Sequence, residues 1–155
     1  MTRHLFLTAL LLVAGTAHAE GDQANMKQLV IVESTKQYET AMKTAAKAAA
    51  YFKLPFQMEG LSANETTGLT YSKAECKKQR ATWPCYDPRG PNDDGAFVSV
   101  EYSSAYLGWN KGYYVVVVTH AYSGDPLIEA TLKRAKKEWP DAYTKSTEVY
   151  VGCSQ

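Results

Sequence analysis

Two stretches of this chain repeat one pattern, and this repeat constrains the fold more than any other feature. Residues 30–60 and 115–152 each read as an apolar strand, a polar break, an amphipathic helix, a proline and a further strand. A helix with one apolar face must bury that face, and two strand–helix–strand units do so in a ferredoxin-like sandwich. We therefore predict an α+β fold with an antiparallel sheet and both helices on one face.

The first half begins with a β-rich apolar run at residues 27–33, which predicts a buried strand. Ser34 and Gln37 fit a capping box at the start of a helix. The proline at position 55 ends that helix, and the alternating residues 56–60 predict a second strand. The predicted buried stripe of the helix consists of Tyr38, Met42, Ala45, Ala49 and Phe52.

An extra strand is predicted before the second half, at residues 96–102, which alternate between apolar and polar types. Residues 113–119 contain four consecutive valines, which indicate a central strand that is buried on both faces. Asp125 and Pro126 are typical of a helix start, and Tyr143 together with residues 148–151 predicts the last strand. The predicted order is βαβ–ββαβ, in which the strand at 96–102 forms a hairpin with the central strand. The predicted buried face of the second helix consists of Leu127, Ile128, Thr131, Leu132, Ala135 and Trp139.

Residues 61–95 have little periodicity and many turn-forming residues, so we expect a long insert between the halves. The chain has three cysteines, which allow one disulfide bond and leave one thiol. Cys76 and Cys85 enclose a short loop, and a bond between them that pins the insert is the favoured pairing. A bond from either of them to Cys153 is the alternative.

The N-terminal residues have the pattern of a signal peptide. Arg3 and His4 precede an apolar run at 5–13 that is too short to span a bilayer, and Ala17-His18-Ala19 fits a signal peptidase site. We expect a periplasmic or secreted protein without a membrane anchor. The predicted organisation is a signal peptide at 1–19, a flexible N-terminus at 20–26 and one α+β domain at 27–155 with the insert at 61–95.

Charge excludes one class of partner. Removal of residues 1–19 takes away Arg3 from 17 basic residues and leaves 16 basic against 16 acidic side chains. Phosphate binding requires a basic excess, so nucleic acid is not an expected partner. A net charge of zero gives no support for binding to a membrane surface either.

Few residues in the chain suggest catalysis or metal binding. His120 precedes Asp125 and has two interpretations, a general base oriented by that aspartate or a histidine at a strand end. Asp87 with residues 92–95 supplies oxygen ligands for calcium, although a plain turn explains the same residues. The predicted mature chain keeps one histidine and lacks a CxxC pair, which disfavours zinc. We expect no catalytic residue, no metal and no cofactor.

Aromatic side chains are the candidate ligand-binding residues. Alternate residues of a strand face opposite sides, and the helices are expected to cover only one face of the sheet. The aromatic residues then form an open platform for sugar rings, or the insert packs Trp83 and Tyr86 onto this face and buries it. The candidates are Trp83, Tyr86, Tyr102, Tyr106, Trp109 and Tyr113.

Residues 113–152, YYVVVVTHAYSGDPLIEATLKRAKKEWPDAYTKSTEVYVG, resemble the SPOR domain, a small module of bacterial envelope proteins. They show the family's strand, loop, helix with alanine and leucine on its core face, and final strand. The resemblance implies a sheet built from two such halves. It also implies binding to peptidoglycan strands that lack stem peptides.

These observations favour an exported, non-enzymatic protein that binds cell-envelope glycan. The alternative is a periplasmic inhibitor or immunity protein that plugs an enzyme cleft with its stapled loop. A third hypothesis is a hydrolase that depends on His120.

The signal-peptide prediction is tested at the mature N-terminus. Mass spectrometry of the exported protein is expected to identify Glu20 as the first residue, because cleavage follows Ala19. Exported material that still begins with Met1 would contradict the assignment.

Overall fold

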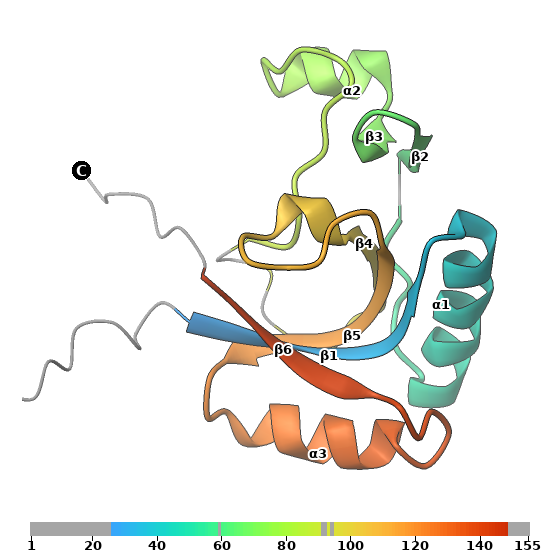
Figure 1. Cartoon of the computed structure of the whole chain (residues 1–155), viewed down its shortest axis with the longest axis vertical. Coiled ribbons are helices and arrows are strands. Elements are labelled where there is room, and N and C mark those ends of the chain that lie inside the picture. The colour runs from blue at the N-terminus through green and yellow to red at the C-terminus, as the bar shows by residue number, and fades with distance from the viewer. Residues whose placement is uncertain (1–25, 59, 91–92, 94, 149–155) are drawn as a thin grey trace, which may run out of the picture.

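Four strands form one antiparallel sheet in the computed structural model, which describes residues 26–58, 60–90, 93 and 95–148 (Figure 1). The sheet order is β4–β5–β1–β6, and every neighbouring pair is antiparallel. The predicted α+β class is confirmed. The strands are β1 (Met26–Thr35), β4 (Ser99–Tyr102), β5 (Tyr114–Tyr122) and β6 (Tyr143–Glu148).

Two helices connect these strands in the split βαβ arrangement of a ferredoxin-like sandwich. Helix α1 (Tyr38–Phe52) follows β1 and leads toward edge strand β4, with β5 lying between the two strands. Helix α3 (Pro126–Ala135) follows β5 and leads to β6, with β1 between them. Both helices pack on β1 and β5 from the same side, as predicted.

The strand predicted at 56–60 does not belong to the sheet. Phe56 makes only an isolated parallel bridge with Val98, and the Gln57 N–H donates to the Val98 carbonyl at 2.8 Å. Phe56 and Met58 alternate in type because both pack against the core from a connecting segment. The strand that completes the first half is therefore β4, and the insert lies inside that half rather than between the halves.

The capping prediction was wrong at α1 and is confirmed at α3. Strand β1 continues to Thr35, which pairs with Tyr114, so Ser34 is still extended and Gln37 is the N-cap. Pairing with β5 thus overrides the local capping signal. At α3 the Asp125 carboxylate accepts a hydrogen bond from the Leu127 N–H at 2.8 Å, and Pro126 is the first helical residue.

The main core lies between the helices and the sheet. Ala45 and Phe52 of the predicted α1 stripe are buried, whereas Met42 and Ala49 lie at its margin. Val116 and Val118 both face this core, and a bulge at Val118 opposite β1 lets the next residue, Thr119, also reach α3. The buried core residues are Val30, Val32, Ala41, Ala45, Ala48, Phe52, Val98, Val100, Val116, Val118, Ala121, Ile128, Ala135 and Ala142.

The opposite face of the sheet is covered by the β4–β5 connection, residues 103–113, which we call the covering segment. It begins with a 3-10 turn, η1 (Ser103–Ala105). Tyr106 and Trp109 of this segment stack at 4.4 Å between ring centroids and pack on Leu29 and Val117. The β5 valines are therefore buried on both faces, as their sequence predicted, and the covering segment is what packs on them. Of the insert, Tyr86 reaches the same face of the sheet at Glu101 on β4, whereas Trp83 is exposed.

The insert forms a small lobe beside the edge strand. Strands β2 (Leu61–Asn64) and β3 (Gly68–Tyr71) form a hairpin, and helix α2 (Lys73–Lys78) follows. The Cys76–Cys85 disulfide is present. Cys153, the predicted signal peptide and the last part of the predicted final strand lie outside the described residues. No helix in the described ranges is long and apolar enough to cross a membrane.

The lobe rests on the sheet through a glycine. Gly68 has a φ of +75°, and a Cβ at this position would overlap the Tyr102 ring. The Gly68 carbonyl also accepts a hydrogen bond from the Tyr114 hydroxyl at 3.0 Å. This close approach fixes β3 against the start of β5, because only glycine fits both the space and the backbone angle.

Replacement of both bonded cysteines tests whether the lobe is separable from the main fold. The bond closes a loop of ten residues counting both cysteines. In the chain-entropy model, loss of such a bond lowers the free energy of unfolding by roughly 2–3 kcal/mol. We expect Cys76→Ser with Cys85→Ser to keep the circular dichroism of the sheet. Amide hydrogen exchange should accelerate in residues 70–86 and stay unchanged in β1 and β5. Equal acceleration in β5 would contradict this separation.

Candidate functional site

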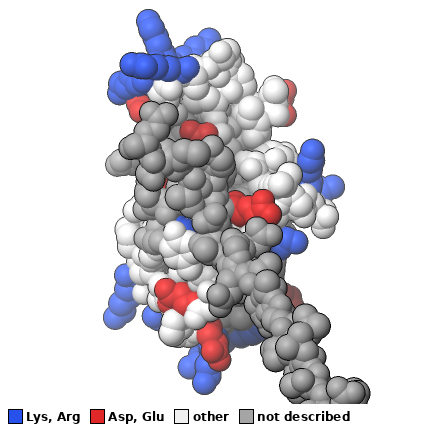
Figure 2. Space-filling view, turned by 90° about the vertical axis from the view of Figure 1, so that its left-hand side faces the viewer, with Lys and Arg blue, Asp and Glu red and all other residues white. Residues whose placement is uncertain are grey.

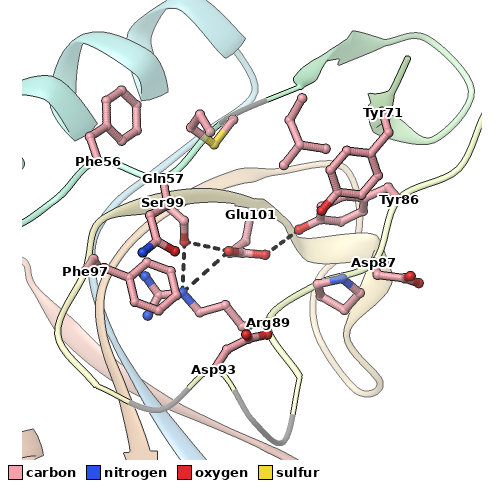
Figure 3. A pocket seen from close by; sticks show the side chains of 13 residues that line it. Phe56, Gln57, Tyr71, Tyr86, Asp87, Arg89, Asp93, Phe97, Ser99 and Glu101 are labelled. Carbon is pink, nitrogen blue, oxygen red and sulfur yellow. Dashed lines mark hydrogen bonds and ion pairs between the residues drawn. The ribbon is translucent and has the colours of Figure 1, made fainter. Parts of the chain in front are cut away.

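A cavity of about 510 Å³ lies between the insert and the edge of the sheet (Figure 3). The insert, residues 61–95, supplies one wall, and β4 with the residues just before it supplies the other. A third side is formed by residues 56–58, which follow α1. The polar residues that line the cavity include Tyr86, Asp87, Arg89, Asp93, Ser99 and Glu101.

Glu101 is the buried centre of the polar wall, with only 4% of its surface exposed. One carboxylate oxygen accepts hydrogen bonds from the hydroxyls of Tyr86 and Tyr106, the latter at 3.2 Å. The other oxygen accepts a hydrogen bond from the Ser99 hydroxyl at 2.5 Å and lies 3.6 Å from Arg89 Nε. Three hydroxyls and one cation therefore surround this carboxylate.

Arg89 is the second buried charge, and its side chain is 2% exposed. Its Nε donates to the Ser99 hydroxyl at 2.9 Å, and Nη2 donates to the Phe97 carbonyl at 2.5 Å. The guanidinium centre lies 3.5 Å from the centroid of the Phe97 ring. Nη1 has no hydrogen-bond partner among the residues that the structure describes. Ser99 thus accepts from the arginine and donates to the carboxylate.

Burial shifts the titration of three members of the cluster. It raises the pKa of Tyr86 and Tyr106 well above the ordinary value, and the neighbouring Glu101 charge raises both further. Both phenols therefore stay protonated at neutral pH and act as donors. Burial lowers the pKa of Arg89, while Glu101 opposes this shift.

The arrangement is that of a structural cluster. Both oxygens of the Glu101 carboxylate accept hydrogen bonds from side chains of the fold. Its partners come from three separate segments: Tyr86 and Arg89 from the insert side, Ser99 from β4, and Tyr106 from the covering segment. The cluster therefore holds these segments together at the cavity wall.

The six predicted aromatic residues do not form one platform. Tyr86 and Tyr106 donate hydrogen bonds to Glu101. Tyr102 packs over Gly68 and against Tyr114, and the ring centroids of Tyr102 and Tyr114 lie 5.1 Å apart. Trp83 lies on the stapled loop and is 43% exposed. Trp109 is buried, and it shares a second hollow with Tyr113.

This second hollow, of about 400 Å³, lies where the covering segment meets β1 and β6. Its other members are not among the residues predicted from the sequence. Tyr143 and Lys145 are two residues apart on β6, and this spacing puts both on one face of a strand. The spacing is the feature of the sequence that could have predicted that they lie together. The hollow is lined by Ser34, Ser103, Trp109, Asn110, Tyr113, Val115, Tyr143 and Lys145.

Trp109 is held rigidly in the wall of this hollow. Its ring stacks on Tyr106, and its indole N–H donates to the Ser146 carbonyl at 3.2 Å. The Tyr143 hydroxyl donates to Ser34 Oγ at 3.4 Å across the β1–β6 pair. The hollow therefore combines fixed aromatic rings with polar groups and the Lys145 ammonium.

The remaining candidates have structural surroundings. His120 is fully buried, and its backbone exchanges hydrogen bonds with Gly95 at 2.9 and 3.2 Å. This burial disfavours a base that acts on a substrate at the surface. Asp93 accepts a hydrogen bond from the Gly90 N–H at 2.6 Å, as in a turn. Within the described ranges no three His, Cys, Asp or Glu side chains form a metal-binding group.

Comparisons of the chain with protein-family models, curated proteins and solved structures found no match. The resemblance of residues 113–152 to the SPOR domain stays a prediction.

The buried ion pair is tested by a double-mutant cycle. Arg89→Met leaves the Glu101 charge buried without its cation, and breaking such a pair from one side costs about 3–5 kcal/mol. We expect Arg89→Met with Glu101→Leu to cost much less than the two single changes combined, in urea unfolding. Additive costs would contradict the coupling. The exposed Glu75–Lys78 pair is the control, because removing it should cost about 1 kcal/mol or less.

Proposed function

We propose that this chain is an exported, non-enzymatic protein that binds carbohydrate, with cell-envelope glycan as the favoured ligand. The proposed site is the hollow formed by Trp109, Tyr113 and Tyr143. The observation that carries the proposal is the presence of these three rings beside polar groups in one hollow of about 400 Å³.

The composition of the hollow supports a sugar ligand. Small-molecule sites combine apolar and aromatic walls with a few polar groups that fix orientation. Here Tyr113 and Tyr143 supply partly exposed rings for the C–H groups of a sugar, and the largely buried Trp109 ring lines the wall. Ser34 and Asn110 offer hydrogen bonds to the sugar hydroxyls. Lys145 adds a positive charge, which favours a sugar that carries a carboxylate.

The rigidity of the hollow supports binding as well. The Tyr106 stack and the hydrogen bond to Ser146 already fix the Trp109 ring. A group that is ordered before binding loses little conformational entropy when a ligand arrives. The same contacts connect the hollow to the Glu101 cluster, because Tyr106 belongs to both.

Three further observations support the cellular setting and a non-enzymatic role. The Cys76–Cys85 disulfide is typical of proteins in oxidising compartments, in line with the predicted signal peptide. The Glu101 carboxylate is engaged by its donors, and the His120 side chain is buried.

The proposal is tested with purified peptidoglycan from which the stem peptides have been removed. We expect the protein to sediment with this material. Tyr113→Ala and Tyr143→Ala should each weaken binding about tenfold, which corresponds to the loss of a ring contact of about 1–1.5 kcal/mol.

Tyr122→Ala is the matched control, because Tyr122, like Tyr143, is an exposed strand tyrosine but lies outside the hollow. It should bind as the unchanged protein does. Failure of the unchanged protein to sediment would refute glycan binding. Full binding by the Tyr113 and Tyr143 variants would refute the hollow as the site.

A further inference from the structure

The loop closed by the Cys76–Cys85 disulfide, together with the residues on either side of it, carries a local positive charge. The zero net charge of the predicted mature chain conceals this charge. Residues 72–86 contain four basic side chains against one acidic side chain, Glu75, which gives a net charge of +3. The basic residues are Lys73, Lys77, Lys78 and Arg80, and all four are exposed. Figure 2 shows basic side chains gathered at the top end of the molecule, where α2 lies in Figure 1.

These cations and Trp83 lie close together. Lys73 and Lys77 are four residues apart and so share one face of α2. Arg80 follows the helix, and its N–H donates to the Lys77 carbonyl at 3.1 Å. The Lys73 ammonium lies 4.9 Å from the centroid of the Trp83 ring, which is 43% exposed. We call Lys73, Lys77, Lys78, Arg80 and Trp83 the basic tip.

The basic tip is held in shape from beneath. Cys76 is fully buried and bonded to Cys85, and the Ala81 N–H donates to the Cys76 carbonyl at 2.9 Å. Cys85 is in turn tied to β3, because its carbonyl accepts from the Tyr71 N–H and its N–H donates to the Thr70 hydroxyl. The cations therefore stay together at the end of a projecting, closed loop.

We propose that the basic tip docks the protein reversibly on a bilayer that contains anionic phospholipid. Anionic headgroups attract nearby lysine and arginine side chains, and tryptophan favours the interface between water and lipid. A projecting end with Lys73 beside an exposed ring, and further exposed cations on the same short segment, can approach a flat surface without rearrangement. This docking is separate from the glycan hollow, which shares no residue with the tip.

The shape of the tip favours a lipid surface over an acidic protein. A stable protein interface buries about 800 Å² on each partner, and its strongest contacts lie in well-packed pockets. The tip is a small projecting loop, and neither of the two cavities described above is lined by any of its five residues. Attraction to an anionic bilayer needs no pocket, because it accumulates with each cation near the surface.

The test compares vesicles of phosphatidylcholine with vesicles that also contain phosphatidylglycerol. We expect the protein to sediment only with the anionic vesicles, and binding should weaken as salt is added. Lys73→Gln with Lys77→Gln should lower the partition coefficient about 25-fold, at about fivefold for each cation removed. Trp83→Ala should also weaken binding.

Lys133→Gln with Lys137→Gln is the matched control. It removes the same charge from two exposed lysines, also four residues apart, at the end of α3. This control should bind as the unchanged protein does, and the melting temperature of each variant verifies folding.

Three results would overturn the proposal. The first is failure to bind the anionic vesicles, and the second is an equal loss in the α3 control, which would indicate attraction by charge alone. The third is binding to soluble polyglutamate that equals or exceeds vesicle binding, which would favour an acidic protein partner.

Discussion

The buried carboxylate of Glu101 is the interaction on which the rest of the arrangement depends. A buried charge is strongly unfavourable unless a cation and hydrogen-bond donors compensate it. Here the compensation comes from Arg89 and from the hydroxyls of Tyr86, Ser99 and Tyr106. Because these donors belong to separate segments, satisfying one carboxylate fixes the insert, the edge strand and the covering segment relative to one another.

This constraint reaches the second hollow through Tyr106. Its hydroxyl binds Glu101, while its ring stacks on Trp109 and packs on the apolar face of the sheet. Trp109 is thereby held in the wall of the hollow that also contains Tyr113, Tyr143 and Lys145. The proposed ligand site is thus rigid because a buried polar cluster orders the segment that carries it.

The insert has two roles with different chemistry. Its base contributes to the Glu101 cluster and rests on Tyr102 through Gly68. Its far end, closed by the Cys76–Cys85 bond, turns outward and carries the basic tip. A chain whose predicted mature form has no net charge therefore still presents a concentrated positive charge, because charge acts over distances of a Debye length and not over the whole molecule.

The sequence by itself determined the features that depend on neighbouring residues. The two amphipathic helices, the buried central valines and the Asp125 cap all follow from local spacing, and so did the ferredoxin-like class. Spacing also favoured the Cys76–Cys85 bond, while the structure decided between it and a bond to Cys153. Only the tertiary structure decided that β4 and not residues 56–60 completes the first half, and that the covering segment buries the second face. The same holds for the candidate site, where Trp109 and Tyr113 were predicted but Tyr143 and Lys145 were not. Strand pairing and burial depend on residues that are distant in the chain, and single-sequence periodicity carries no information about which distant segments meet.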